Sequence, residues 1–182
     1  MKIKLALTLL CALINVFGFA QLIDEEFEAP TNIPATWISN GVAISTNNSC
    51  AGSLQSVVFS GAGNALTTPL LVDPGDLKFL YTRSSDATAW TLIVEYATST
   101  LGFWTTIGTI TDATDVDCLP FTYDLSALSN IYVRFRDARI SGADERYIDN
   151  VVVTQRPMAV SLLNFGVNGT ENSALLNCST TK

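Results

Sequence analysis

The sequence predicts an all-β protein, an antiparallel β-sandwich, on three observations. Val, Ile, Thr and aromatic residues recur in short runs, and no long segment shows the 3.6-residue periodicity of an amphipathic helix. Gly, Pro, Asn and Asp separate nearly all of these runs, as turns require. The runs also follow one another at regular intervals, which is typical of a sandwich.

The first twenty residues indicate a secretory signal peptide. Lys2 and Lys4 precede an apolar run over residues 5–17, which ends in Gly-Phe-Ala. The run is shorter than the roughly 18 to 20 apolar residues that a membrane-spanning helix needs. We therefore expect cleavage before Gln21, a secreted or cell-surface product, and no membrane insertion after cleavage.

The next 135 residues, 21–155, are expected to form the sandwich. Turns are predicted at the segments FSGAGNAL, VDPGDL, STLGFW and RISGADER, which supply residues that adopt positive or fixed φ. A short Ser-Ala turn follows near residue 125. Between such turns the predicted strands, in order, are 22–28, 41–45, 56–60, 77–82, 91–97, 104–109, 121–124, 131–137 and 147–154.

The strand pattern breaks at Arg156-Pro157, so residues 156–182 are expected to form a linker and a separate β-hairpin. Its predicted strands, 160–167 and 174–179, flank a Gly-Thr-Glu-Asn turn. Because a lone hairpin is only marginally stable in water, it is expected to open a truncated second β-domain. Packing of the hairpin onto the first domain is the alternative.

Charge and the absence of histidine exclude several classes of function. Removing Lys2 and Lys4 with the signal peptide takes the net charge from −7 to −9, which disfavours nucleic acid and anionic membranes as partners. The chain has no histidine, so Ser-His-Asp and Cys-His catalysis and Cys/His zinc sites are disfavoured. Carboxylate-pair glycoside hydrolases pass this test, since they need only two acids that flank the sugar bond.

Three cysteines remain once Cys11 is removed with the signal peptide: Cys50, Cys118 and Cys178. In an oxidising compartment this number indicates one disulfide and one unpaired cysteine. Cys50 and Cys118 both lie in turn-like stretches, so we predict a disulfide between them. Two unpaired surface thiols are the alternative.

Several segments together resemble the MAM-like, cleaved-adhesin-like jelly-roll modules of bacterial secreted surface proteins. They are FEAPTNIPATWISNGVAIS, GSLQSVVFSGAGNALTTPLL, AWTLIVEYATS, WTTIGTI, YDLSALSNIYVRFRD and ERYIDNVVVT, and the resemblance covers residues 22–154. It implies a concanavalin/MAM-like jelly roll that is not an enzyme. The function it implies is adhesion, or binding of a glycan or surface protein, within a larger exported protein.

The tail MAVSLLNFGVNGTENSALLNCSTT is similar to the segment that follows such modules in type IX secretion substrates. In those proteins a fibronectin-like domain begins there with a Val-Ser-Leu-Leu-x-Phe strand and a Leu-Asn-Trp strand. This chain has Cys178 at the tryptophan position. The resemblance thus implies the start of a truncated fibronectin-like domain.

The resemblance also implies a structural calcium ion between an acid near the first strand and one on the last. The candidate ligands are Glu26, Glu28, Asp149 and Asn150, since calcium takes six to eight oxygen ligands. The alternative is that Glu26 and Glu28 are solvated, while Asp149 pairs with Arg146 or a backbone amide. A calcium-stabilised structural spacer without a ligand of its own is therefore a second hypothesis for the module.

A glycan-binding module needs exposed aromatic side chains as stacking platforms. The candidates are Trp90, Tyr96, Trp104 and Tyr147. The alternative for each is a core position, because aromatic residues that begin or end a strand commonly anchor it in the core.

Two charged segments have alternative interpretations. The stretch IDEEFE superficially resembles the catalytic strand of laminarinase-type glycosidases, but Leu22 occupies the place of the first acid, so hydrolase activity is the least supported hypothesis. The stretch RFRDARISGADER is expected to form ion pairs on a solvated face. A ligand-contacting loop over residues 138–145 is the alternative.

Overall fold

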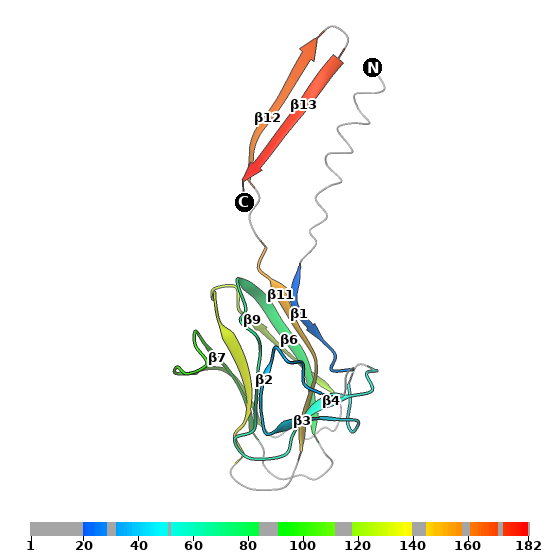
Figure 1. The fold of residues 1–182 in the computed structure, drawn as a ribbon, viewed down its shortest axis with the longest axis vertical. Helices are drawn as coiled ribbons and strands as arrows, with labels where there is room; N and C mark the ends of the chain where they lie inside the picture. The colour runs from blue at the N-terminus through cyan, green and yellow to red at the C-terminus, as the bar shows by residue number, and fades with distance from the viewer. Residues whose placement is uncertain are drawn as a thin grey trace.

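The structure is a computed structural model that describes residues 20–28, 32–50, 52–83, 91–111, 118–139, 145–157, 161–170 and 173–181, the last two as backbone. These residues form no helix, and two antiparallel sheets pack face to face (Figure 1). The predicted all-β antiparallel sandwich is confirmed. Among the described residues, no helix is long and apolar enough to cross a membrane.

The first sheet, called the β11 sheet, is built around the long strand β11 (Arg146–Gln155). Its order is β3 (Val42–Ser45), β4 (Ser56–Phe59), β11, β6 (Pro74–Arg83) and β9 (Leu119–Asp124), and β1 (Gln21–Glu25) also pairs with β11.

One edge of β11 is shared by two strands. Residues Arg146 to Ile148 pair with β4, and Val151 to Thr154 pair with β1. Between these two stretches β11 has one more residue than the facing part of β6, which makes a β-bulge. The bulge follows Asp149 and contains Asn150, which adopts the left-handed conformation with φ of 49°.

The second sheet, called the β10 sheet, has the order β2 (Ile38–Asn40), β5 (Ala65–Thr67), β10 (Tyr132–Asp137), β7 (Thr91–Ala97) and β8 (Thr105–Thr111). β10 lies at its centre, and its outward residues Arg134 and Arg136 have neighbours on both β5 and β7. The bend between β7 and β8 projects from the left side of the sandwich in Figure 1.

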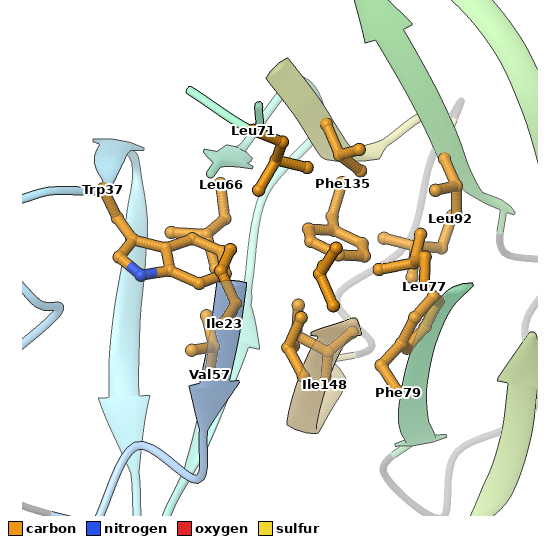
Figure 2. Packing of buried hydrophobic residues seen from close by; sticks show 14 of the residues in the cluster. Ile23, Trp37, Val57, Leu66, Leu71, Leu77, Phe79, Leu92, Phe135 and Ile148 are labelled. Carbon is orange, nitrogen blue, oxygen red and sulfur yellow. The ribbon is translucent and has the colours of Figure 1, made fainter. Parts of the chain in front are cut away.

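The hydrophobic core lies between the two sheets. Figure 2 shows Leu92 and Phe135 of the β10 sheet meeting Leu77, Phe79 and Ile148 of the β11 sheet. The Phe79 and Phe135 rings pack edge to face with centroids 5.0 Å apart, a geometry that favours aromatic pairs. Side chains from four strands thus fix the spacing of the sheets, while the alternate side chains of β7 and β10 lie on the outer surface.

The strands differ from the predicted ones mainly at short segments. β2 and β5 are additional strands of three residues each. The predicted turn VDPGDL contains the start of β6, and the chain reverses just before it at Asp73, where φ is 49°. Beyond the sandwich, β12 (Ser161–Thr170) and β13 (Ser173–Thr181) pair as the predicted hairpin. Its assignment to a fibronectin-like domain stays a prediction.

Candidate binding face

A charged cluster lies at the centre of the outer face of the β10 sheet. On β10, buried Val133 and Phe135 alternate with Arg134 and Arg136, so both arginines point outward. β7 places Glu95 directly opposite Arg134 in the strand register. The two arginines therefore flank a single carboxylate from the neighbouring strand.

Both guanidinium groups bind Glu95. The Nε and Nη2 atoms of Arg134 donate to Oε2 at 2.8 and 2.6 Å, and Nη2 of Arg136 donates to Oε1 at 2.8 Å. Glu95 is only 4% exposed although it lies on an outer face. Burial opposes its ionisation, but the hydrogen bonds from Arg136 and Arg134 outweigh burial and lower the pKa of this carboxyl.

Trp104 completes the cluster, because its ring lies 4.0 Å from the guanidinium carbon of Arg134. Its indole is half-buried. The strand register places one row of residues across the whole sheet. In order from β2 to β8 the row consists of Ile38, Thr67, Arg134, Glu95 and Thr106. The face thus combines an aromatic ring, charged donors, a fixed acceptor and hydroxyl groups, the mixture typical of sites that orient a polar ligand.

The predicted aromatic platforms have different outcomes. Trp104 lies on the outer face, while half-buried Tyr96 packs against the core. Tyr147 is 1% exposed and donates its hydroxyl hydrogen to Glu145. Burial together with this bond raises its pKa to about 12. Tyr147 is a core residue, so its assignment to an exposed platform was wrong, and Trp90 lies outside the described residues.

Asp149, the acid at the start of the β11 bulge, is fully buried. Its Oδ2 accepts hydrogen bonds from the Cys50 N–H at 2.7 Å and the Ser53 hydroxyl at 2.5 Å, and its Oδ1 accepts the Asn150 N–H at 2.7 Å. Burial raises the pKa of Asp149, and nearby Glu28 adds to the rise. This acid therefore fastens the turn after β3 to the last strand of the sandwich.

The predicted calcium ligands come together only in part. Glu28 accepts the Leu54 N–H and lies close enough to Asp149 to raise its pKa. Glu26 is exposed, and Asn150 lines the outer surface of the β11 sheet. Over the described ranges, no three His, Cys, Asp or Glu side chains form a group that could hold a metal ion. Glu28 and Asp149 are thus the pair on which a calcium site would depend.

The structure contains the predicted disulfide between Cys50 and Cys118, with sulfur atoms 2.05 Å apart. It links two segments that are 68 residues apart in sequence. One is the turn that Asp149 caps, and the other leads directly into β9. Covalent and hydrogen-bonded restraints therefore meet at the same turn.

The other charges near β10 are buried instead of solvated. Arg139 donates through Nε to Asp137 at 2.7 Å and through Nη2 to the Phe59 carbonyl at 3.0 Å. Arg146 lies 4.0 Å from Asp137. Because all three charged side chains are buried, the predicted solvated face was wrong at these positions. Most of the loop over residues 138–145 lies outside the described residues.

A shallow depression of about 270 Å³ lies on the outer face of the β11 sheet. Its lining is mainly apolar and includes Lys78, Leu80, Pro120, Thr122, Asn150 and Val152. Its lining does not contain a carboxylate held between two arginines, as the β10 sheet does, so the outer face of the β10 sheet is the stronger candidate for a binding site.

No protein-family model matches this chain, and no curated protein matches it. Several solved structures, by contrast, are similar in fold. The K3 cleaved adhesin domain of Lys-gingipain from Porphyromonas gingivalis is similar with a TM-score of 0.57 at 19% identity, over 75% of this chain and 100% of that one.

Carbohydrate-binding modules are also similar. The C-terminal family 22 module of Clostridium thermocellum Xyn10B has a TM-score of 0.56 at 16% identity, over 76% of this chain and 96% of that one. The CBM22-1 xylan-binding domain of Paenibacillus barcinonensis Xyn10C has a TM-score of 0.58 at 11% identity, over 78% of this chain and 97% of that one. The chain therefore shares the β-sandwich fold of adhesin and carbohydrate-binding modules.

Proposed function

We propose that this chain is a non-catalytic, secreted or cell-surface module that binds a glycan on the outer face of its β10 sheet. The observation that carries the proposal is the cluster of Trp104, Glu95, Arg134 and Arg136 at the centre of that face. Similarity to adhesin, xylan-binding and other carbohydrate-binding modules supports it. Attachment to a larger protein exported by the type IX route remains a prediction from the sequence.

The geometry suits recognition of sugar hydroxyls. Each guanidinium has five N–H donors, more than one shared carboxylate accepts, so Arg134 and Arg136 retain donors for a ligand. Glu95 is ionised and, being only 4% exposed, orients the two guanidinium groups instead of contacting the ligand itself. The half-exposed indole of Trp104 adds an apolar surface for the face of a sugar ring.

The same electrostatics support a binding role over catalysis. A glycosidase acid needs a raised pKa so that it carries a proton near neutral pH. Glu95 has a lowered pKa. Asp149 has a raised pKa but is fully buried behind the turn after β3, where a polysaccharide has no access.

Affinity electrophoresis tests the proposal with residues 21–182 and gels containing soluble xylan, β-glucan, galactan or mannan. We expect at least one polysaccharide to retard the protein, and Trp104→Ala to weaken binding by tenfold or more, equivalent to about 1.4 kcal/mol. Tyr123→Ala is the matched control, because Tyr123 is an exposed aromatic residue on β9 of the other sheet. Retardation by none of these polysaccharides favours the spacer hypothesis, and equal losses in both variants place the site elsewhere.

We further propose that Glu28 and Asp149 bind calcium weakly, with backbone carbonyls and water as the remaining ligands. Two carboxylates are few for a calcium site, so we expect a dissociation constant of about 10⁻⁴ to 10⁻³ M, as in extracellular modules. Calcium at a hundredfold excess would raise the free energy of unfolding by roughly 2.7 kcal/mol. Thermal unfolding with calcium or EDTA tests this: Glu28→Gln should abolish the shift, and exposed Glu26→Gln should keep it.

A further inference from the structure

The outermost strands of the two sheets differ in how they are protected from pairing with another chain. β2 and β3 have only three and four residues, β1 carries two acids, and β9 contains a proline and an aspartate. Each of these features discourages edge-to-edge pairing. β8 has seven residues, Thr-Thr-Ile-Gly-Thr-Ile-Thr, with neither charge nor proline. Among the edge strands of the two sandwich sheets, it is the longest with neither charge nor proline, and its pairing with β7 contains one register shift.

The turn that leads into β8 is also apolar and exposed. Leu101 and Phe103 are 96% and 101% exposed. The turn has a defined shape, because the Gly102 N–H donates to the Ser99 carbonyl at 3.1 Å and the Leu101 N–H to the Ser99 hydroxyl at 3.3 Å. Residues 97–111 contain no charged side chain. Two large apolar side chains held outward in this way indicate a surface that another molecule covers.

We propose that β8 pairs antiparallel with β8 of a second copy of this chain and so extends the β10 sheet across a two-fold axis. Charge favours this partner: the chain carries −9 once residues 1–20 are removed, but an uncharged edge brings no like charges into opposition. The strand is also self-complementary. Pairing centred on Gly108 places Thr105 opposite Thr111 and Ile107 opposite Thr109, and a two-fold interface requires one surface to fit itself.

Edge pairing leaves the outer face of each sheet open. The clusters around Glu95 in the two copies would then lie on one continuous sheet, so a dimer would present two binding faces to one polymer. Self-association does not depend on glycan binding, and a failure of either proposal leaves the other intact.

Sedimentation velocity of residues 21–182 from about 10 µM to 1 mM tests the pairing, in the range expected for a small interface. A Cys178→Ser background excludes a covalent dimer through that cysteine. We expect dimers, and an increase of tenfold or more in the dissociation constant for Thr109→Lys, because an edge lysine opposes pairing. Thr122→Lys is the control, since Thr122 is an exposed threonine on β9 of the other sheet.

Both variants should keep the wild-type melting temperature, which shows that they fold. A wild type that stays monomeric at 1 mM overturns the proposal, as does equal weakening by the two lysines. A neutral lipid surface is the competing partner for the apolar turn. Monomers that co-sediment with phosphatidylcholine vesicles, and lose this property in Phe103→Ser, would also overturn it.

Discussion

Replacing Asp149 with alanine tests how the last strand is fastened to the turn after β3. The buried carboxylate accepts three hydrogen bonds, from the Cys50 and Asn150 N–H groups at 2.7 Å each and from the Ser53 hydroxyl at 2.5 Å. Alanine leaves two backbone N–H groups without this acceptor, at roughly 1 to 3 kcal/mol for each one that stays buried. We expect a loss of about 2 to 6 kcal/mol in the free energy of unfolding.

Urea denaturation followed by tryptophan fluorescence measures this loss. A shift of this size lowers the melting temperature by about 10 °C or more in a domain of this length. Asp76→Ala is the matched control, because Asp76 is half-exposed and lies 3.6 Å from half-exposed Lys78 in a surface pair. We expect the control to change stability by less than about 0.5 kcal/mol. Equal stability of the two variants would refute the role assigned to Asp149.

The pH dependence of stability gives an independent check on the same residue. Burial raises the pKa of Asp149 above its ordinary value of 3.8, so the folded state binds this proton more tightly than the unfolded state. The bound proton on Asp149 therefore contributes its full stabilisation below pH 3.8, and this contribution declines as the pH rises through the raised pKa. We expect the stability of the wild type relative to Asp149→Asn to fall over this interval, and a constant difference would contradict the reasoning.

Two further substitutions test the packing. Replacing Cys50 and Cys118 with alanine removes a disulfide between positions 68 residues apart, and should reduce the free energy of unfolding by about 2 to 4 kcal/mol. Urea titration measures this loss, and unchanged stability would contradict the structural role of the disulfide. Gly108→Ala should lower the free energy of unfolding by about 1 to 3 kcal/mol, because its Cβ would lie 2.5 Å from the Phe121 ring. Gly102→Ala should leave the free energy of unfolding nearly unchanged, because its Cβ would lie 3.4 Å from the nearest atom, the Ser99 carbonyl oxygen. Equal shifts in melting temperature for the two variants would contradict the crowding at β8.

The long strands could be predicted from the sequence, because their alternation of apolar and polar residues is visible over six or more positions. The predicted strand 91–97 matches β7, and the predicted 131–137 differs from β10 by one residue. β2 and β5 could not be found this way, since three residues do not establish a period of two. Pro74 led to a predicted turn over residues 72–77, because proline is common in turns. It is in fact the first residue of β6, a position where proline is tolerated.

The candidate site could be predicted only in part. The expected ion pairs on a solvated face are found at Arg134 and Arg136, which alternate with buried Val133 and Phe135 on β10. Their partner Glu95 is 39 residues from Arg134, and only the pairing of β7 with β10 brings it between them. An acid within the otherwise uncharged strand Thr-Leu-Ile-Val-Glu-Tyr-Ala was the signal that a fixed partner exists.

The role of Asp149 likewise depended on contacts distant in sequence. The acid is 99 residues from Cys50 and 96 from Ser53, and the strand order alone brings them together. The resemblance to jelly-roll modules indicated that an acid on the last strand lies near the first. The backbone N–H donors of the turn, which the carboxylate binds in this structure, carry no sequence signature.

The most direct test of the proposed glycan-binding face is to map amide chemical shifts by NMR as the best-binding polysaccharide fragment is titrated in. The account predicts that the changes concentrate on β7, β8 and β10, around Glu95, Trp104 and Arg134. Changes concentrated around Lys78 and Val152, in the depression on the β11 sheet, would place the ligand on the opposite face and contradict it.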